Sequence, residues 1–247
     1  MDIPTKALMD EQFRKKAAIL KTIFFEICKY SSDYIDIQNA EKIKYYNIST
    51  DKMIIITSSI SSHVLMLYNF IEGSINDRFK LLYYTVNGEN ILYPDASHQM
   101  QLIWLENHYS YESAKAKEKG IQRLADDWNR PITIYFTSPH TNYSMGTIRR
   151  VLRHHGVRYN LDKSDFFDEI ALFRNKCAHG DIDFTLFPYS IKDLFRVTNS
   201  IYLSVYQMVT AISSYIDDKR YLKISQYPDG FAPPYVTTPN LIDHFPQ

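Results

Sequence analysis

Glycine is scarce in this sequence, with 7 residues in 247, about 3% where soluble proteins have roughly 7%. Few positions can therefore take a positive φ, and the tight turns of β-hairpins depend on such positions. The shortage favours long helices over many short strands. It predicts an all-α protein.

Cysteine content and net charge exclude further classes of protein. Cys28 and Cys177 are the only cysteines, so a disulfide scaffold and a cysteine zinc site are excluded, and a reducing cytoplasm is the expected location. The 28 basic and 28 acidic residues cancel, which excludes bulk electrostatic adhesion to nucleic acid or anionic lipid. The N-terminal residues MDIPTKALMDEQFRKK have no apolar stretch behind their charges, so we expect no signal peptide.

Several catalytic motifs are also missing, namely GxxxxGKS/T, GxGxxG, HExxH, CxxC and GxSxG. Their absence disfavours phosphate-loop enzymes, dinucleotide enzymes, zincins and serine hydrolases. Metal binding by the adjacent His154 and His155 is disfavoured too, because neighbouring helical residues point in different directions. We therefore expect neither a cofactor nor a metal ion.

The longest uncharged run, residues 53–71, raises the question of a membrane span. It contains serines, threonine, histidine and asparagine, which is too many polar groups for a lone helix in lipid. We interpret it as a buried core helix.

Apolar residues recur at helical spacing along most of the chain. We expect helices over residues 5–30, 53–85, 97–109, 114–128, 142–156, 164–180 and 188–218, with 33–46 either a short helix or irregular. Asp51 and Ser164 are the expected N-caps of the second and sixth helices. Gly156 and Gly180 are the expected ends of the fifth and sixth.

One segment, residues 131–137, has strong β-propensity, and it is either a small hairpin partner or an extended connector. Five of the ten prolines lie in residues 228–247, which predicts an extended tail. We expect a single helical domain over residues 1–227, followed by this tail.

The segment Arg174-Asn175-Lys176-Cys177-Ala178-His179-Gly180 closes one of the predicted helices. At 3.6 residues per turn, Phe166, Ile170, Phe173 and Cys177 share a face that we expect to be buried. Asn175 and His179 share the opposite face, while Arg174 is expected to reach around the helix or to face a neighbouring subunit. Histidine exchanges a proton near neutral pH, and arginine offers a fork of donors to phosphate oxygens.

RNKCAHG resembles the Arg-polar-x-x-x-His signature of the HEPN superfamily (higher eukaryotes and prokaryotes nucleotide-binding), in particular its stand-alone bacterial nuclease-like members. Two other stretches are similar to the RiboL-PSP type of HEPN protein. They are YNFIEGSINDRF, with an aromatic-x-Glu-Gly element, and SMGTIRRVLRHHGV, which precedes the motif helix.

The resemblance implies a helical bundle that forms a homodimer with a composite cleft, and metal-independent endoribonuclease activity of bacterial defence or toxin type. His179 is then the general acid or base, Arg174 stabilises charge on phosphorus, Asn175 orients the phosphate or the histidine, and Glu72 supports the site. An antitoxin or another defence protein is a possible partner. Many HEPN domains act only as interaction modules, so a non-catalytic module that binds a partner protein or nucleotide is the alternative.

A basic cluster precedes the motif helix, in a stretch without acidic residues from Asn142 to Asn160. Its members are Arg149, Arg150, Arg153, His154 and Arg158. The cluster predicts a surface that guides an RNA backbone to the site. The alternative for the cluster is a solvated helix face whose charges pair with acidic residues. The alternative for the RNKCAHG segment is a simple helix C-terminus whose polar side chains cap backbone carbonyls.

Overall fold

The computed structural model describes residues 4–39, 50–109, 128–135, 143–159, 166–179 and 191–223 of the chain. These residues form α-helices and no strand, which confirms the predicted all-α class. The helices are α1 (Lys6–Asn39), α2 (Thr50–Gly88), α3 (His98–Tyr109), α5 (Met145–His154), α6 (Phe166–His179) and α7 (Ile191–Asp217), with the short 3-10 helix η1 (Tyr93–Asp95) between α2 and α3.

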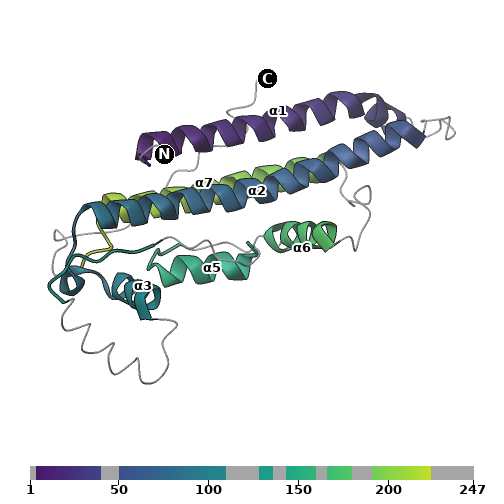
Figure 1. The fold of residues 1–247 in the computed structure, drawn as a ribbon. Coiled ribbons are helices and arrows are strands. Elements are labelled where there is room, and N and C mark those ends of the chain that lie inside the picture. Colours follow the sequence, from purple (N-terminus) through teal and green to yellow (C-terminus); the bar gives the residue numbers. More distant parts are fainter. Residues whose placement is uncertain are drawn as a thin grey trace.

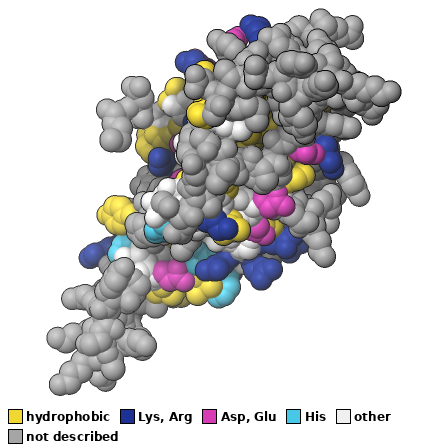
Figure 2. Space-filling model, turned by 90° about the vertical axis from the view of Figure 1, so that its right-hand side faces the viewer, with side chains coloured by type: hydrophobic (Ala, Val, Ile, Leu, Met, Phe, Trp, Pro, Cys, Tyr) yellow, Lys and Arg dark blue, Asp and Glu magenta, His cyan; other side chains and the backbone are white. Residues whose placement is uncertain are grey.

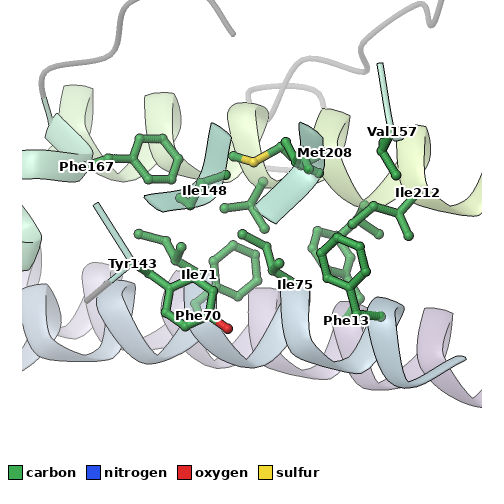
Figure 3. Packing of buried hydrophobic residues seen from close by; sticks show 14 of the residues in the cluster. Phe13, Phe70, Ile71, Ile75, Tyr143, Ile148, Val157, Phe167, Met208 and Ile212 are labelled. Atoms are coloured by element: carbon green, nitrogen blue, oxygen red, sulfur yellow. The ribbon is translucent and has the colours of Figure 1, made fainter. Parts of the chain in front are cut away.

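Helix α2 lies at the centre of the arrangement (Figure 1). It packs along α1 and α7, and α5 and α6 lie below it in this view. Side chains from these five helices meet in one apolar core (Figure 3), and Ile71, Ile148, Phe167, Met208 and Ile212 have no exposed surface there. Each fully buried side chain of this kind contributes about 1.5–3 kcal/mol to folding.

The long uncharged run belongs to α2. By length and composition alone, α2 qualifies as a membrane span, and it is the only helix among the described residues that does. Val64, Leu67 and Ile71 are fully buried under neighbouring helices, so the run forms part of the core. This confirms the interpretation of residues 53–71 as a buried core helix.

The helix boundaries follow capping chemistry in part. Ser144 caps α5, since its side chain accepts a hydrogen bond from the Thr147 N–H, and Gly156 follows the helix with φ +74°. The end at Gly156 was predicted, and the helix begins slightly later than the predicted range of 142–156. Asp51, in contrast, lies inside the first turn of α2, because the helix already includes Thr50.

Two further expectations about the helices have different outcomes. α1 continues through Asn39 without the break expected near residue 30, although the apolar spacing weakens there. Ser164, Gly180, residues 110–127 and the proline-rich tail lie outside the described residues.

Residues 131–135 form an extended connector and not a hairpin strand, which decides between the two alternatives for this segment. Ile132 and Ile134 are 1% exposed, whereas Pro131, Thr133 and Tyr135 point outward, as the period-two alternation of an extended chain requires. A single antiparallel bridge joins Pro131 to Leu92.

Asparagine side chains fix this connector to two helices. The Asn87 side-chain amide, at the end of α2, donates to the Ile134 carbonyl over 2.9 Å and accepts from its N–H over 2.8 Å. The Tyr135 N–H donates to Asn107 of α3 over 2.8 Å. Asn87 thus satisfies both backbone polar groups of Ile134, as a paired β-strand would.

Two histidines are buried in neutral form. His63 of α2 lies 2.9 Å from the Thr198 hydroxyl of α7, and burial lowers its pKa to about 4. His155, which follows α5, donates from Nδ1 to the Val151 carbonyl and accepts at Nε2 from the Tyr83 hydroxyl. Burial lowers the pKa of His155 to about 4 as well. His155 thereby holds the end of α5 against α2.

These two histidines predict acid destabilisation. In the unfolded chain they bind protons below pH 6.5, and in the folded chain only near pH 4. The free energy of unfolding therefore falls as the pH decreases from 6.5 to about 4, by on the order of 3 kcal/mol per histidine over the whole window.

Urea unfolding at pH 7.5, 6.5, 5.5 and 5.0 measures this loss, since carboxylates titrate mostly below that range. In the double variant His63→Gln, His155→Gln the stability is lower at every pH, but its dependence on pH between 6.5 and 5.0 is largely removed. An unchanged slope in that variant would assign the acid sensitivity to other groups.

Candidate functional site

Helix α6 carries the RNKCAH segment, and its packing decides how that segment is presented. Phe167 and Ile170 are fully buried and Phe173 is 5% exposed, whereas Phe166 and Cys177 are only half-buried. The expected buried stripe is thus confirmed for Ile170 and Phe173, while Phe166 and Cys177 at its two ends pack against the core but stay half-buried. The physical reason is that α6 contacts both α2 and α7, so its buried arc is wider and turned toward Phe167.

This rotation places Arg174, which stays exposed, where the buried face of α6 meets the surface. Its guanidinium lies 5.3 Å from the centroid of the Tyr68 ring of α2, within the range of a cation–π interaction. Arg174 also donates a 3.4 Å hydrogen bond to the Asn175 side chain. Arg174 thus has an aromatic partner within its own chain and is still exposed.

Asn175 and His179 lie one turn apart, so their side chains are neighbours on the helix surface. His179 is exposed in the last turn of α6, and Asn175 is half-buried. The structure thus brings Arg174 and Asn175 into contact and leaves His179 open to solvent beside them.

Tyr68 is a part of this site that the sequence analysis did not single out. It is 3% exposed, and its hydroxyl accepts a hydrogen bond from the Tyr143 N–H over 3.2 Å. The Tyr143 hydroxyl in turn donates to Asn76. Tyr68 begins the quoted YNFIEG stretch. Its position four residues before Glu72 puts both on one side of a helix, and this spacing could have pointed to Tyr68 as part of the site.

Glu72 and Gly73, the Glu-Gly pair of that stretch, lie next to different helices. Glu72 lies one turn beyond Tyr68 on the same side of α2 and is half-buried, but within the described residues no ion pair joins it to Arg174. A side chain at Gly73 would come within 2.9 Å of the Lys16 ammonium, which pairs with Asp77. Gly73 therefore leaves room for a contact between α1 and α2.

The basic residues form the outer face of α5, which we call the basic face. Ile148 and Leu152 point into the core, and the exposed residues are Arg149, Arg150, Arg153 and His154, with Arg158 exposed beyond the helix. Lys and Arg side chains gather on the lower half of one view of the molecule, with acidic side chains among them (Figure 2). His154 is 3.2 Å from Glu106 of α3, so one member of the basic face already has an acidic neighbour.

Helices α5 and α6 meet at their N-termini. The Met145 N–H donates to the Asp168 carboxylate over 2.9 Å. From that point α5 leads toward Tyr83 of α2 and α6 leads toward Tyr68, so the two helices run in opposite directions under α2 (Figure 1). The basic face and His179 therefore lie toward opposite ends of this pair, with the acidic first turn of α6 between them.

A pocket of about 290 Å³ lies elsewhere, between the start of α1 and the ends of α2 and α7. Leu81, Tyr84 and Ile216 line it, and the ion pair between Lys6 and Asp217 lies at its edge. None of the predicted site residues lines this pocket. In the described part of the chain, no three His, Cys, Asp or Glu side chains are grouped so that they could hold a metal ion.

No protein-family model, curated protein or solved structure matches this chain. The resemblance to HEPN proteins therefore rests on its three sequence elements.

The contact between α5 and α6 predicts a specific loss of stability. Asp168→Ala leaves the Met145 N–H without its acceptor and is expected to lower the free energy of unfolding by about 1–2 kcal/mol. Glu169→Ala is the matched control, because it removes an exposed acid from the same turn and is expected to cost less than about 0.5 kcal/mol. Urea unfolding of both variants measures the difference, and equal losses would mean that only the helix dipole matters.

Proposed function

We propose that this protein is a metal-independent endoribonuclease of the HEPN type, with Arg174, Asn175 and His179 as its catalytic residues. The observation that supports this proposal best is the exposed end of α6. There Arg174 is held between Tyr68 and Asn175, and His179 projects into solvent one turn away. A phosphodiester can approach such a group of donors from outside without any rearrangement of the core.

The chemistry is an in-line transesterification within the RNA. The 2′-oxygen attacks phosphorus, the bond from phosphorus to the 5′-oxygen breaks, and a 2′,3′-cyclic phosphate remains. The 2′-hydroxyl loses a proton and the leaving 5′-oxygen gains one, which is the work of a general base and a general acid, and His179 is the side chain proposed for it. The Arg174 guanidinium stays charged and stabilises the developing charge on the phosphate oxygens.

The proposal includes a homodimer in which two α6 ends share one cleft. Within a single chain the basic face lies away from His179, so RNA that contacts both must cover the length of α5 and α6. A second copy would supply a second histidine, so that one removes a proton while the other delivers one.

Cleavage of RNA in excess EDTA tests the catalytic residues. We expect wild-type protein to leave 2′,3′-cyclic phosphate ends, and His179→Ala and Arg174→Ala to lower the cleavage rate by at least about 100-fold. Lys176→Ala is the matched control, since it removes an exposed charge from the same turn of α6, and it is expected to retain most activity. Equal cleavage by wild type and His179→Ala, or no cleavage by either, would refute the catalytic proposal.

The basic face makes a separate, electrostatic prediction about binding. In the double variant Arg150→Ala, Arg153→Ala, two phosphate contacts are lost, so the slope of log affinity against log salt becomes shallower by about 1.4 for a single strand. The control variant Arg14→Ala, Lys15→Ala changes two exposed charges on α1, across α2 from the basic face. Fluorescence anisotropy of labelled RNA between 50 and 300 mM salt measures both slopes. Equal slopes in the two variants would show that RNA does not follow α5.

A further inference from the structure

Five aromatic rings form a continuous row at the end of the molecule that carries α3. The ring centroids are 6.3 Å apart between Tyr135 and His108, 4.8 Å between His108 and Trp104, 5.2 Å between Trp104 and Tyr93, and 5.3 Å between Tyr93 and Trp128. Two rings of the row are buried, and His108 and the two end rings are exposed. Trp104 and Tyr93 are 5% and 8% exposed, whereas Trp128 is 44% and Tyr135 is 63% exposed.

The backbone forces Tyr135 outward and holds it there. Ile132 and Ile134 take the inward positions of the connector, so the alternation places Tyr135 on the outside. The paired hydrogen bonds between Asn87 and Ile134, and the one that the Tyr135 N–H donates to the Asn107 side chain, fix the backbone that carries the ring. Since the ring is already positioned, a planar ligand that stacks on it loses little conformational entropy in the protein.

Positive charge lies near this row. Arg130 is exposed two residues after Trp128, in the same connector. The basic face of α5 lies across α3, because His154 contacts Glu106, and Gly156 lies close enough to Gln99 that an added side chain would touch it. The row of rings and the basic face are thus separated by about one helix diameter, roughly 10–12 Å. A strand of a few nucleotides spans such a distance.

Exposed aromatic rings beside arginines are what proteins use to bind single-stranded nucleic acid. Unstacked bases pack on the rings while the phosphates follow the positive groove, and each stacked base contributes about 1–3 kcal/mol. A duplex offers no free base face except at its ends, so it cannot use the rings in this way. Exposed rings beside arginines therefore favour single-stranded over duplex nucleic acid, whereas positive charge alone binds both.

We propose that Trp128 and Tyr135 are a stacking platform for unpaired bases of single-stranded RNA whose backbone runs along the basic face of α5. This inference rests on the proposed function and deepens it, because it names the class of RNA that the protein takes. The platform binds and positions RNA, and the cleavage residues lie elsewhere, on α6.

Tryptophan fluorescence is a direct probe, because the chain has only two tryptophans and Trp104 is buried. The probe ligand is a 12-nucleotide 2′-O-methyl RNA, which cannot be cleaved, as a single strand or annealed to its complement. We expect the single strand to quench the fluorescence of the full-length protein and the duplex to quench it far less. Trp128→Ala is expected to abolish this quenching.

Affinities from fluorescence anisotropy complete the experiment. Trp128→Ala and Tyr135→Ala are each expected to weaken single-strand binding by about 5- to 150-fold, the equivalent of one stacked base, and to leave duplex binding unchanged. Trp128→Phe and Tyr135→Phe keep a ring and are expected to retain most of the affinity. Tyr84→Ala is the matched control, because Tyr84 is also 44% exposed but lies at the pocket between α1 and α7.

The platform is refuted if both alanine variants, folded as judged by circular dichroism and thermal unfolding, bind the single strand as wild type does. It is also refuted if they lose duplex and single-strand binding equally. These outcomes are separable from failure of the proposed cleavage. Ring-dependent binding without cleavage in EDTA would leave the platform standing and refute the nuclease, whereas His179-dependent cleavage with ring-independent binding would do the reverse.

Discussion

Burial of α2 over more than half of its circumference is the constraint on which the rest of the structure depends. Leu67, Phe70, Ile71, Ile75 and Phe79 are at most 3% exposed, and at 100° per residue they point in directions that span about half a circle. A helix with so wide an apolar face must be covered by several others. α1 and α7 pack along α2, and α5 and α6 lie below it in Figure 1. A functional site can therefore lie only on the outer faces or at the ends of the helices that cover α2.

The candidate site follows from that arrangement. α6 is buried along a wide arc between α2 and α7, so its polar residues can reach solvent only on its outer side and near its end. Arg174 lies where the buried arc meets the surface, and this position explains how it can touch Tyr68 while staying exposed. The contact between the N-termini of α5 and α6 then separates the basic face from His179. In the proposed function, RNA that uses both surfaces has to cover two helices or meet a second copy of the chain.

Buried polar groups add specificity to an otherwise apolar interior. His63 pairs with Thr198, Tyr83 with His155, and Arg78, which is 2% exposed, pairs with Asp10 at 2.5 Å. Each pair joins α2 to a different element, and an unpaired group of this kind would lose its hydrogen bonds to water without replacement. Such pairs define the alignment of each neighbour along α2, which non-directional apolar contacts do less well.

The sequence alone determined the features that depend on local pattern. Scarce glycine and 3.6-residue spacing predicted the all-α class, Gly156 predicted the end of α5, and the β-propensity of residues 131–137 gave an extended connector as one of two alternatives, because these signals act between residues close in the chain. Only the tertiary structure decided the rotation of α6, the Tyr68 partner of Arg174, the role of Asn87 and the row of rings from Trp128 to Tyr135. Each of these depends on residues far apart in the chain that meet only when the helices pack, and periodicity within one helix carries no information about which neighbour will cover it.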